Sequence, residues 1–131
     1  MTMLLDGRVA IVTGAASGNG RAIARAFAGH GAQVIVADLT ETPREGGRPT
    51  TDVIQENHPG QAQFFRCDVT QVADLQAAVA LAEEWGGLAI MVNNAGILRK
   101  EPILDAIEAM FEQMIDVNVK SVFFGCQAAA R

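Results

Sequence analysis

A glycine-rich segment near the N-terminus has the residue types and spacing of a phosphate-binding turn. It comprises residues 13–20, Thr-Gly-Ala-Ala-Ser-Gly-Asn-Gly, and directly follows the apolar run 9–12. Its first glycine permits a tight turn, its second keeps the backbone open to a ligand, and its third lets a helix pack against a strand. The N–H groups and the dipole at the start of that helix favour an anion. We predict a seat for a dinucleotide pyrophosphate, formed by Gly14, Ser17, Gly18, Asn19 and Gly20.

A P-loop, the other glycine-rich phosphate motif, is not supported. That motif ends in glycine, lysine and a serine or threonine, whereas Gly20 is followed by Arg21 and Ala22. A glycine motif alone also fits an ordinary turn, so the interpretation depends on residues elsewhere in the chain.

An acidic residue, Asp38, stands at the predicted end of the second strand, 18 positions after Gly20. A carboxylate at that place accepts hydrogen bonds from the adenosine ribose hydroxyls and repels a 2′-phosphate. The neighbouring Leu39 is also predicted to contact the cofactor, and it adds no cation that would offset this repulsion. We therefore expect NAD rather than NADP as the cofactor. Taken alone, Asp38 also fits a turn or capping residue.

Polar residues also follow the third and fourth predicted strands. Because ligands in parallel α/β sheets bind beyond the carboxyl ends of the strands, we expect these residues near the cofactor. Asp68 is predicted to meet the adenine amino group, although it also fits the N-cap of a helix that begins near Thr70. The segment after the fourth strand is predicted to lie near a ribose, although it also fits an ordinary turn. The predicted contacts are Asp68, Val69, Asn94, Ala95 and Gly96.

The elements that must position these residues alternate between strand and helix. Short apolar segments predict strands at 8–13, 33–37, 63–67 and 88–92, and helices are expected at 20–28, near 51–57, and at 72–85, 103–115 and 117–130. The first two of these strands are expected to be buried, and strands without polar alternation indicate a parallel sheet with helices on both faces. We predict an α/β fold, namely a Rossmann-type doubly wound parallel sheet with helices on both faces. About four strands, the first half of that fold, lie in residues 1–131 as a single domain.

Composition excludes several classes of function. The net charge of −5 argues against a nucleic-acid partner. No run has membrane-spanning length, and residues 1–8 lack the apolar core of a signal peptide. Cys67 and Cys126 have no CxxC spacing, so we expect two small core residues in a reducing cytosol. His30 and His58 are isolated, and we expect no metal site. The predicted location is the cytoplasm, with no membrane partner.

Taken together, these segments resemble the short-chain dehydrogenase/reductase family over residues 5–131. The matching residues are 13–20, Asp38, Cys67-Asp68-Val69, Asn93-Asn94-Ala95-Gly96 and Asp116-Val117-Asn118-Val119. The resemblance implies a Rossmann-type fold and hydride transfer between NAD(H) and a small-molecule alcohol or carbonyl substrate. It also implies that Asn118 supports the active site and its proton-relay water. Without the family context, Asn118 fits an ordinary polar residue of a helix. We expect a homo-oligomer for the full-length protein.

The sequence departs from the family pattern in two places. Asn19 stands where the family usually has isoleucine, and we expect the change to be tolerated. The family's catalytic serine and its Tyr-x-x-x-Lys pair follow the asparagine and have no counterpart here. The chain has no tyrosine, and its serines and lysines are Ser17, Ser121, Lys100 and Lys120.

The missing residues lead us to expect a truncated dehydrogenase that holds only the NAD-binding half. Such a chain would bind NADH without turnover, because the general acid/base is absent. A non-catalytic dinucleotide-binding module, or a degenerate family member, is the alternative. A methyltransferase with a similar sheet is disfavoured by the Thr13-Gly14 start and by the turn at 93–96.

Overall fold

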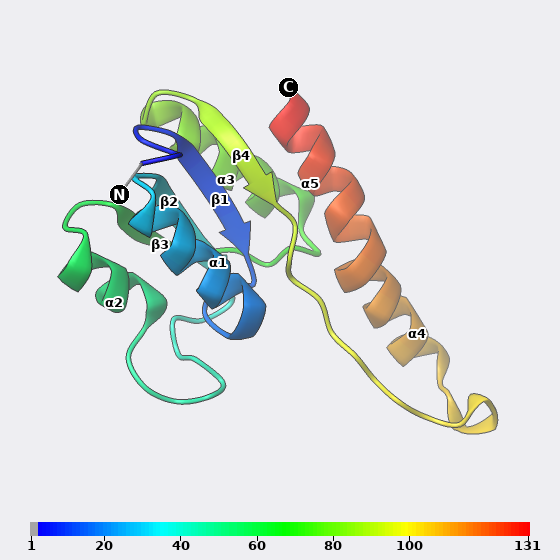
Figure 1. Cartoon of the computed structure of the whole chain (residues 1–131). Helices are drawn as coiled ribbons and strands as arrows, with labels where there is room; N and C mark the ends of the chain where they lie inside the picture. The colour runs from blue at the N-terminus through cyan, green and yellow to red at the C-terminus, as the bar shows by residue number, and fades with distance from the viewer. Residues whose placement is uncertain (1–2) are drawn as a thin grey trace.

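A parallel sheet with helices on both faces forms the body of the molecule (Figure 1). The computed structural model describes residues 3–131. In that part of the chain the sheet has the order β3-β2-β1-β4, and each neighbouring pair of strands is parallel. The predicted Rossmann-type α/β arrangement is therefore confirmed. The strands are β1 (Val9–Thr13), β2 (Gln33–Asp38), β3 (Ala62–Arg66) and β4 (Leu88–Val92).

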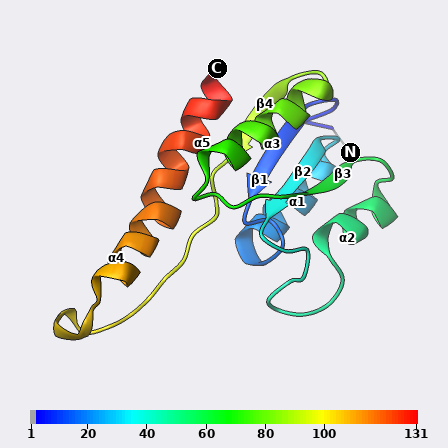
Figure 2. The same cartoon turned by 180° about the vertical axis from the view of Figure 1, so that it is seen from behind.

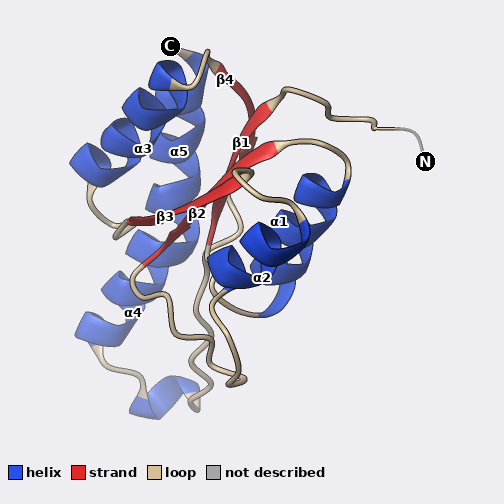
Figure 3. Cartoon of the chain, turned by 90° about the vertical axis from the view of Figure 1, so that its left-hand side faces the viewer, coloured by secondary structure: helices blue, strands red, loops and turns tan. Residues whose placement is uncertain are grey.

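The helices cover the two faces of the sheet in pairs, as Figure 3 shows. Helices α1 and α2 lie on one face, and α3 and α5 lie on the other. No helix of residues 3–131 is long and apolar enough to cross a membrane. The α-helices are α1 (Gly18–Gly29), α2 (Thr50–Asn57), α3 (Val72–Glu84), α4 (Glu108–Ile115) and α5 (Ser121–Ala130).

The two central strands are apolar because each of their faces is covered. Successive side chains of a strand point to opposite faces. Val12 packs in the cluster beneath α1 and α2, whereas its neighbour Ile11 packs in the cluster beneath α3. Both side chains are fully buried. The prediction that the first two strands are buried is confirmed by β1 and β2. The edge strands β3 and β4 are only partly covered.

The C-terminal helices differ from the prediction of two helices at 103–115 and 117–130. Ile103–Asp105 form a short 3-10 turn after Pro102, and α4 begins only at Glu108. A π-helical turn, Asp116–Lys120, joins α4 to α5 without a break. The reason is that the joining residues keep helical backbone angles and no glycine or proline interrupts 108–120. Seen from behind in Figure 2, α4 extends away from the sheet as a continuation of α5.

The prediction that both cysteines are core residues is wrong for one of them. Cys67 is 2% exposed, whereas Cys126 is exposed on α5. Burial raises the pKa of the Cys67 thiol to about 12, and the nearby carboxylates of Asp74, Asp68 and Asp38 add to the shift. Since the thiolate is the reactive form, Cys67 is inert near neutral pH.

We expect an aromatic disulfide reagent at pH 8 to label one thiol per folded chain and two per unfolded chain. The thiol that reacts in the folded chain is that of the exposed Cys126, so Cys126→Ser should leave the folded chain almost unlabelled. Raising the pH from 7 to 9 should leave Cys67 of the folded chain unlabelled, because its raised pKa keeps the thiol protonated throughout this range. Rapid labelling of both thiols in the folded wild type would contradict the burial of Cys67.

Candidate functional site

The glycine-rich turn lies at the carboxyl end of β1, between the strand and α1 (Figure 1). Gly14 has a φ of +65°, and a Cβ atom there would lie 2.9 Å from the Cα atom of Ala95. A Cβ atom on Gly20 would lie 2.2 Å from the carbonyl oxygen of Gly14. The predicted steric roles of these two glycines are therefore confirmed. Gly18 has a φ of +53° and an open side, where the nearest atom to an added Cβ is 3.9 Å away on Arg44.

Thr13 connects this turn to the segment after β4, a role that the sequence did not reveal. Its buried hydroxyl oxygen accepts hydrogen bonds from the N–H groups of Asn94 and Ala95, both at 3.0 Å. The same hydroxyl donates to the carbonyl oxygen of Val92 at 3.3 Å. The side-chain amide of Asn94 donates to the carbonyl oxygen of Thr13 at 3.0 Å. Asn94 thus fixes the turn. The feature of the sequence that could have indicated the role of Thr13 is a polar residue at the end of a buried strand.

Gly125 of α5 lets the helix come close to the same segment. A Cβ atom on Gly125 would lie 2.0 Å from Oδ1 of Asn93. The Asn93 amide also donates to Sγ of Cys126 at 3.5 Å. The residues after β4 are thus held from β1 on one side and from α5 on the other.

The Asp38 carboxylate lies beside the glycine-rich turn. Its Oδ2 accepts a hydrogen bond from the N–H of Ala16 at 2.9 Å, and its Oδ1 accepts from the N–H of Leu39 at 2.7 Å. Leu39 itself is exposed. The structure therefore brings the end of β2 next to the turn, and both hydrogen bonds hold the carboxylate in place.

Asp68 and Val69 follow β3 at the same edge of the sheet. The Oδ1 atom of Asp68 accepts from the N–H and the hydroxyl of Thr70, at 3.0 and 2.7 Å. The N-cap alternative for Asp68 is wrong, because Gln71 is the N-cap residue of α3, and Asp68 instead closes the turn before the helix. The N–H of Asp68 donates to Asp74 of α3 at 2.9 Å. Val69 packs against the apolar cluster beneath α3.

Asn118 lies in the π-helical turn and binds the backbone of one residue twice. Its Oδ1 accepts from the N–H of Ile97, and its Nδ2 donates to the Ile97 carbonyl, both at 2.8 Å. Gly96 is adjacent, since a Cβ atom there would lie 3.2 Å from Oδ1 of Asn118. Ser121 is buried and donates to the carbonyl oxygen of Val117. Asn118 therefore attaches the segment after β4 to the continuous helix formed by α4, the π-helical turn and α5.

The segment 39–49, which we name the crossover loop, contacts the glycine-rich turn. The N–H of Gly18 donates to Oε2 of Glu45 at 2.9 Å, and the N–H of Arg44 donates to Oγ of Ser17 at 2.8 Å. The hydrogen bond from Gly18 is the main reason that the pKa of the Glu45 carboxyl lies below its usual value, and Ser17 and Arg21 add to the effect. The sequence indicated only an irregular loop here, because no periodicity reveals such contacts.

Thr50 and Arg21 hold the base of the crossover loop. The buried Thr50 hydroxyl donates to the carbonyl oxygen of Ala15 at 2.8 Å. The Arg21 guanidinium donates to the Arg48 carbonyl at 2.8 Å and to the Thr50 hydroxyl at 3.1 Å. These contacts leave the Arg21 side chain half-buried.

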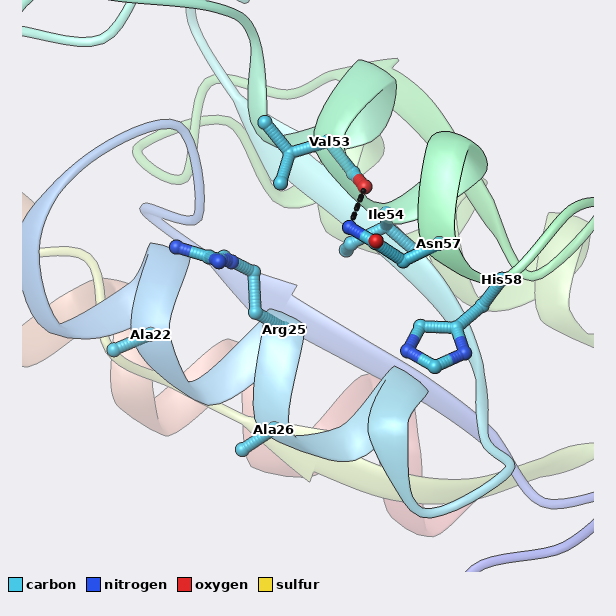
Figure 4. A pocket seen from close by; sticks show the side chains of 7 residues that line it. All are labelled: Ala22, Arg25, Ala26, Val53, Ile54, Asn57 and His58. Carbon is cyan, nitrogen blue, oxygen red and sulfur yellow. Dashed lines mark hydrogen bonds between the residues drawn. The ribbon is translucent and has the colours of Figure 1, made fainter.

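A separate hollow of about 700 Å³ lies between α1 and α2 (Figure 4). None of its lining residues belongs to the predicted nucleotide contacts, and its Asn57 amide donates to the Val53 carbonyl at 3.0 Å. Among the residues that the structure describes, no three His, Cys, Asp or Glu side chains are grouped to hold a metal ion. The polar groups with the predicted spacing gather instead at the carboxyl ends of the strands. The residues that line the hollow are Ala22, Arg25, Ala26, Val53, Ile54, Asn57 and His58.

Comparison with known protein families and solved structures agrees with this arrangement. The model of the short chain dehydrogenase family matches residues 8–131. Zerumbone synthase from Zingiber zerumbet is 41% identical over 98% of this chain and 48% of its own length. L-2,3-butanediol dehydrogenase from Corynebacterium glutamicum is 41% identical over 95% of this chain and 48% of its own length.

Solved structures show the same fold over nearly the whole chain. A hydroxysteroid dehydrogenase from Escherichia coli has a TM-score of 0.85 and 37% identity, covering 98% of this chain and 53% of that protein. A short-chain type dehydrogenase/reductase from Mycobacterium marinum has a TM-score of 0.84 and 36% identity, covering 100% of this chain and 53% of that protein. The chain spans about half the length of the relatives that it matches. The family match and the site geometry agree, and the chain belongs to the short-chain dehydrogenase family.

Proposed function

We propose that this chain binds NAD(H) at the carboxyl edge of its sheet. We further propose that the whole protein is an NAD-dependent oxidoreductase that transfers hydride between NAD(H) and an alcohol or carbonyl substrate. The family uses a nicotinamide dinucleotide, which supplies the hydride chemistry when it is bound. The names of relatives such as L-2,3-butanediol dehydrogenase and D-threitol dehydrogenase support a substrate of the alcohol class.

The contacts at the start of α1 support an anion at this place. The Gly18 N–H already donates a hydrogen bond to the carboxylate of Glu45. This donor therefore points away from the helix and can bind a negatively charged group. The left-handed backbone of Gly18 and the open space at its side leave room for a phosphate group. A pyrophosphate would receive the same hydrogen bond with the favourable helix dipole behind it.

The proposed preference for NAD over NADP rests on the position of Asp38. Its carboxylate is fixed beside the glycine-rich turn by the N–H groups of Ala16 and Leu39. A ribose whose pyrophosphate occupies the turn would bring its hydroxyls to this carboxylate. A 2′-phosphate at the same place would meet a like charge, which costs several kcal/mol when it is not compensated.

The remaining predicted residues are proposed to complete the site. Asp68 and Val69 would border the adenine, while Ala95 and Gly96 would border a ribose. Asn118 would hold the segment after β4 in place through Ile97 and would support the active site from there. A general acid/base matching the family tyrosine is not among the 131 residues. The proposal for this chain is therefore confined to holding the cofactor without turnover.

A fluorescence titration with NADH and NADPH tests the choice of cofactor. We expect NADH to bind at least about tenfold tighter than NADPH, because the fixed carboxylate favours hydroxyls over a phosphate. Asp38→Ala should weaken NADH binding by about tenfold or more, as expected for the loss of a hydrogen bond to a charged group. The same variant should reduce the difference in affinity between NADH and NADPH.

Asp105→Ala is the matched control, since Asp105 lies in the exposed 3-10 turn away from the strand ends. It removes the same side chain and charge and should leave both affinities unchanged. Tighter binding of NADPH by the wild type would contradict the role of Asp38. Absence of binding for both cofactors would contradict the whole proposal.

A further inference from the structure

The crossover loop places a carboxylate at the start of α1, where the proposed function places a phosphate. The N–H of Gly18 is one of the groups at a helix start that lack a partner within the helix. In this structure that group donates to Oε2 of Glu45 at 2.9 Å. The Glu45 carboxylate and the cofactor phosphate would therefore compete for one donor. Two negative groups would also repel each other at this position.

A second contact holds the tip of the loop over the turn. The buried Ser17 hydroxyl accepts the N–H of Arg44 at 2.8 Å. Residues 44 and 45 thus cover two successive residues of the glycine-rich turn. A ligand that reaches Ser17 and Gly18 must displace both contacts.

The loop is built so that its tip can move while its base stays attached. Gly46 and Gly47 directly follow Glu45, with φ values of +82° and +90°, and an added Cβ on either would meet nothing within 4 Å. Glycine reaches many backbone conformations at low energy, so this pair is suited to act as a hinge. The base is held separately by the buried Thr50, which donates to the carbonyl oxygen of Ala15 at 2.8 Å.

The charge of Arg21 would remain at the start of α1 after the Glu45 carboxylate has moved, because Arg21 belongs to α1 and not to the loop. Arg21 acts on the Glu45 carboxylate, and the Arg44 guanidinium lies beside Gly18. With Glu45 in place, its carboxylate offsets part of the charge of Arg21. Once Glu45 has moved, Arg21 would favour the phosphate groups.

We propose that Glu45 is a built-in competitor that occupies the phosphate seat and lowers the affinity of this chain for its dinucleotide. The inference rests on the proposed cofactor site, because it assumes that the phosphates bind at the start of α1. Binding then consists of an exchange in which the dinucleotide replaces Glu45 at the Gly18 N–H and the crossover loop opens at Gly46 and Gly47.

Calorimetric titration of the whole 131-residue chain with NADH tests the exchange. Glu45→Gln keeps the size of the side chain and removes its charge, and we expect it to bind NADH about two- to fivefold tighter than the wild type. Glu45→Ala should bind at least as tightly as Glu45→Gln. Glu41→Gln removes the same charge from an exposed position of the same loop and should leave the affinity at the wild-type value.

A measurement without cofactor tests the contact itself. In amide nuclear magnetic resonance spectra, Glu45→Gln should shift the Gly18 signal, whereas Glu41→Gln should not. Addition of NADH to the wild type should shift the signals of Gly18, Gly46 and Gly47 together. Circular dichroism checks that each variant remains folded, as the exposed position of residue 45 leads us to expect.

The possible outcomes separate this inference from the proposed function. If the wild type binds NADH and Glu45→Gln binds no tighter than Glu41→Gln, the competition is refuted while the cofactor site stands. If Glu45→Gln binds more weakly, Glu45 supports the seat and the inference is wrong. If no form of the chain binds NADH, the cofactor site is refuted and the inference is refuted with it.

Discussion

Gly20→Ala is expected to lower the free energy of unfolding by about 1–3 kcal/mol, the usual range for overpacking, although alanine is the better helix former. The new Cβ atom would lie 2.2 Å from the carbonyl oxygen of Gly14 and 2.6 Å from Nδ2 of Asn94. The first of these atoms is backbone and belongs to the tight turn, so it cannot move aside cheaply. Steric conflict therefore outweighs the gain of about 0.5–1 kcal/mol in helix propensity.

The same substitution should also damage the cofactor seat. Relief of the clash with the Gly14 carbonyl requires α1 to move away from the turn, and the Asn94 amide, which donates to the carbonyl oxygen of Thr13, must give way as well. The movement of α1 displaces the N–H groups at its start from the position that a phosphate needs. We expect NADH to bind to Gly20→Ala more weakly than an increased fraction of unfolded chain alone would explain.

Urea unfolding followed by circular dichroism measures the effect on stability, and a fluorescence titration measures the effect on NADH binding. Gly29→Ala is the matched control, because it makes the same change at the last residue of the same helix. A Cβ atom on Gly29 would meet only Nε2 of His58, at 3.9 Å. That control should be neutral or slightly stabilising. Equal stability of Gly20→Ala and the wild type would show that the close approach of α1 to the turn is not required.

The parallel α/β arrangement and the gathering of the candidate site residues at one edge of the sheet could be predicted, because both depend on short-range patterns. Apolar runs that end in glycine or aspartate mark parallel strands, and the carboxyl ends of such strands meet at one edge. Asp38 and the glycine-rich turn were therefore assigned to one site, and the structure places them in direct contact. The steric roles of Gly14 and Gly20 followed from the same motif.

The contacts that hold the site together could not be predicted, because they join residues far apart in the sequence. Thr13 bonds to residues 94 and 95, Asn118 bonds to Ile97, and Glu45 bonds to Gly18. In each pair at least one partner lies in an irregular segment that has no periodicity to read. The bend of the chain around 103–107 was missed for a similar reason, since apolar residues there are exposed rather than buried on a helix face.

Thr13 and Thr51 each have a buried hydroxyl oxygen, but of the two only the Thr13 hydroxyl takes part in hydrogen bonds. The Thr13 hydroxyl accepts two backbone hydrogen bonds and donates a third. Within the described residues, the Thr51 hydroxyl oxygen is buried without a hydrogen-bond partner. Replacement by valine preserves the shape of the side chain and exchanges the hydroxyl for a methyl group, so the pair of variants compares a bonded with an unbonded hydroxyl.

Thr13→Val is expected to lower the free energy of unfolding by about 2–4 kcal/mol, because it leaves the N–H groups of Asn94 and Ala95 without their acceptor. Thr51→Val should be neutral or stabilising, since it removes a polar atom whose burial is not compensated. Urea unfolding of both variants measures the difference. NADH affinity should fall for Thr13→Val alone, because the segment after β4 loses its attachment to the glycine-rich turn. If the two variants lost equal stability, the Thr13 hydroxyl would have no special role, and the position of Asn94 to Gly96 would depend on Asn93 and α5 instead.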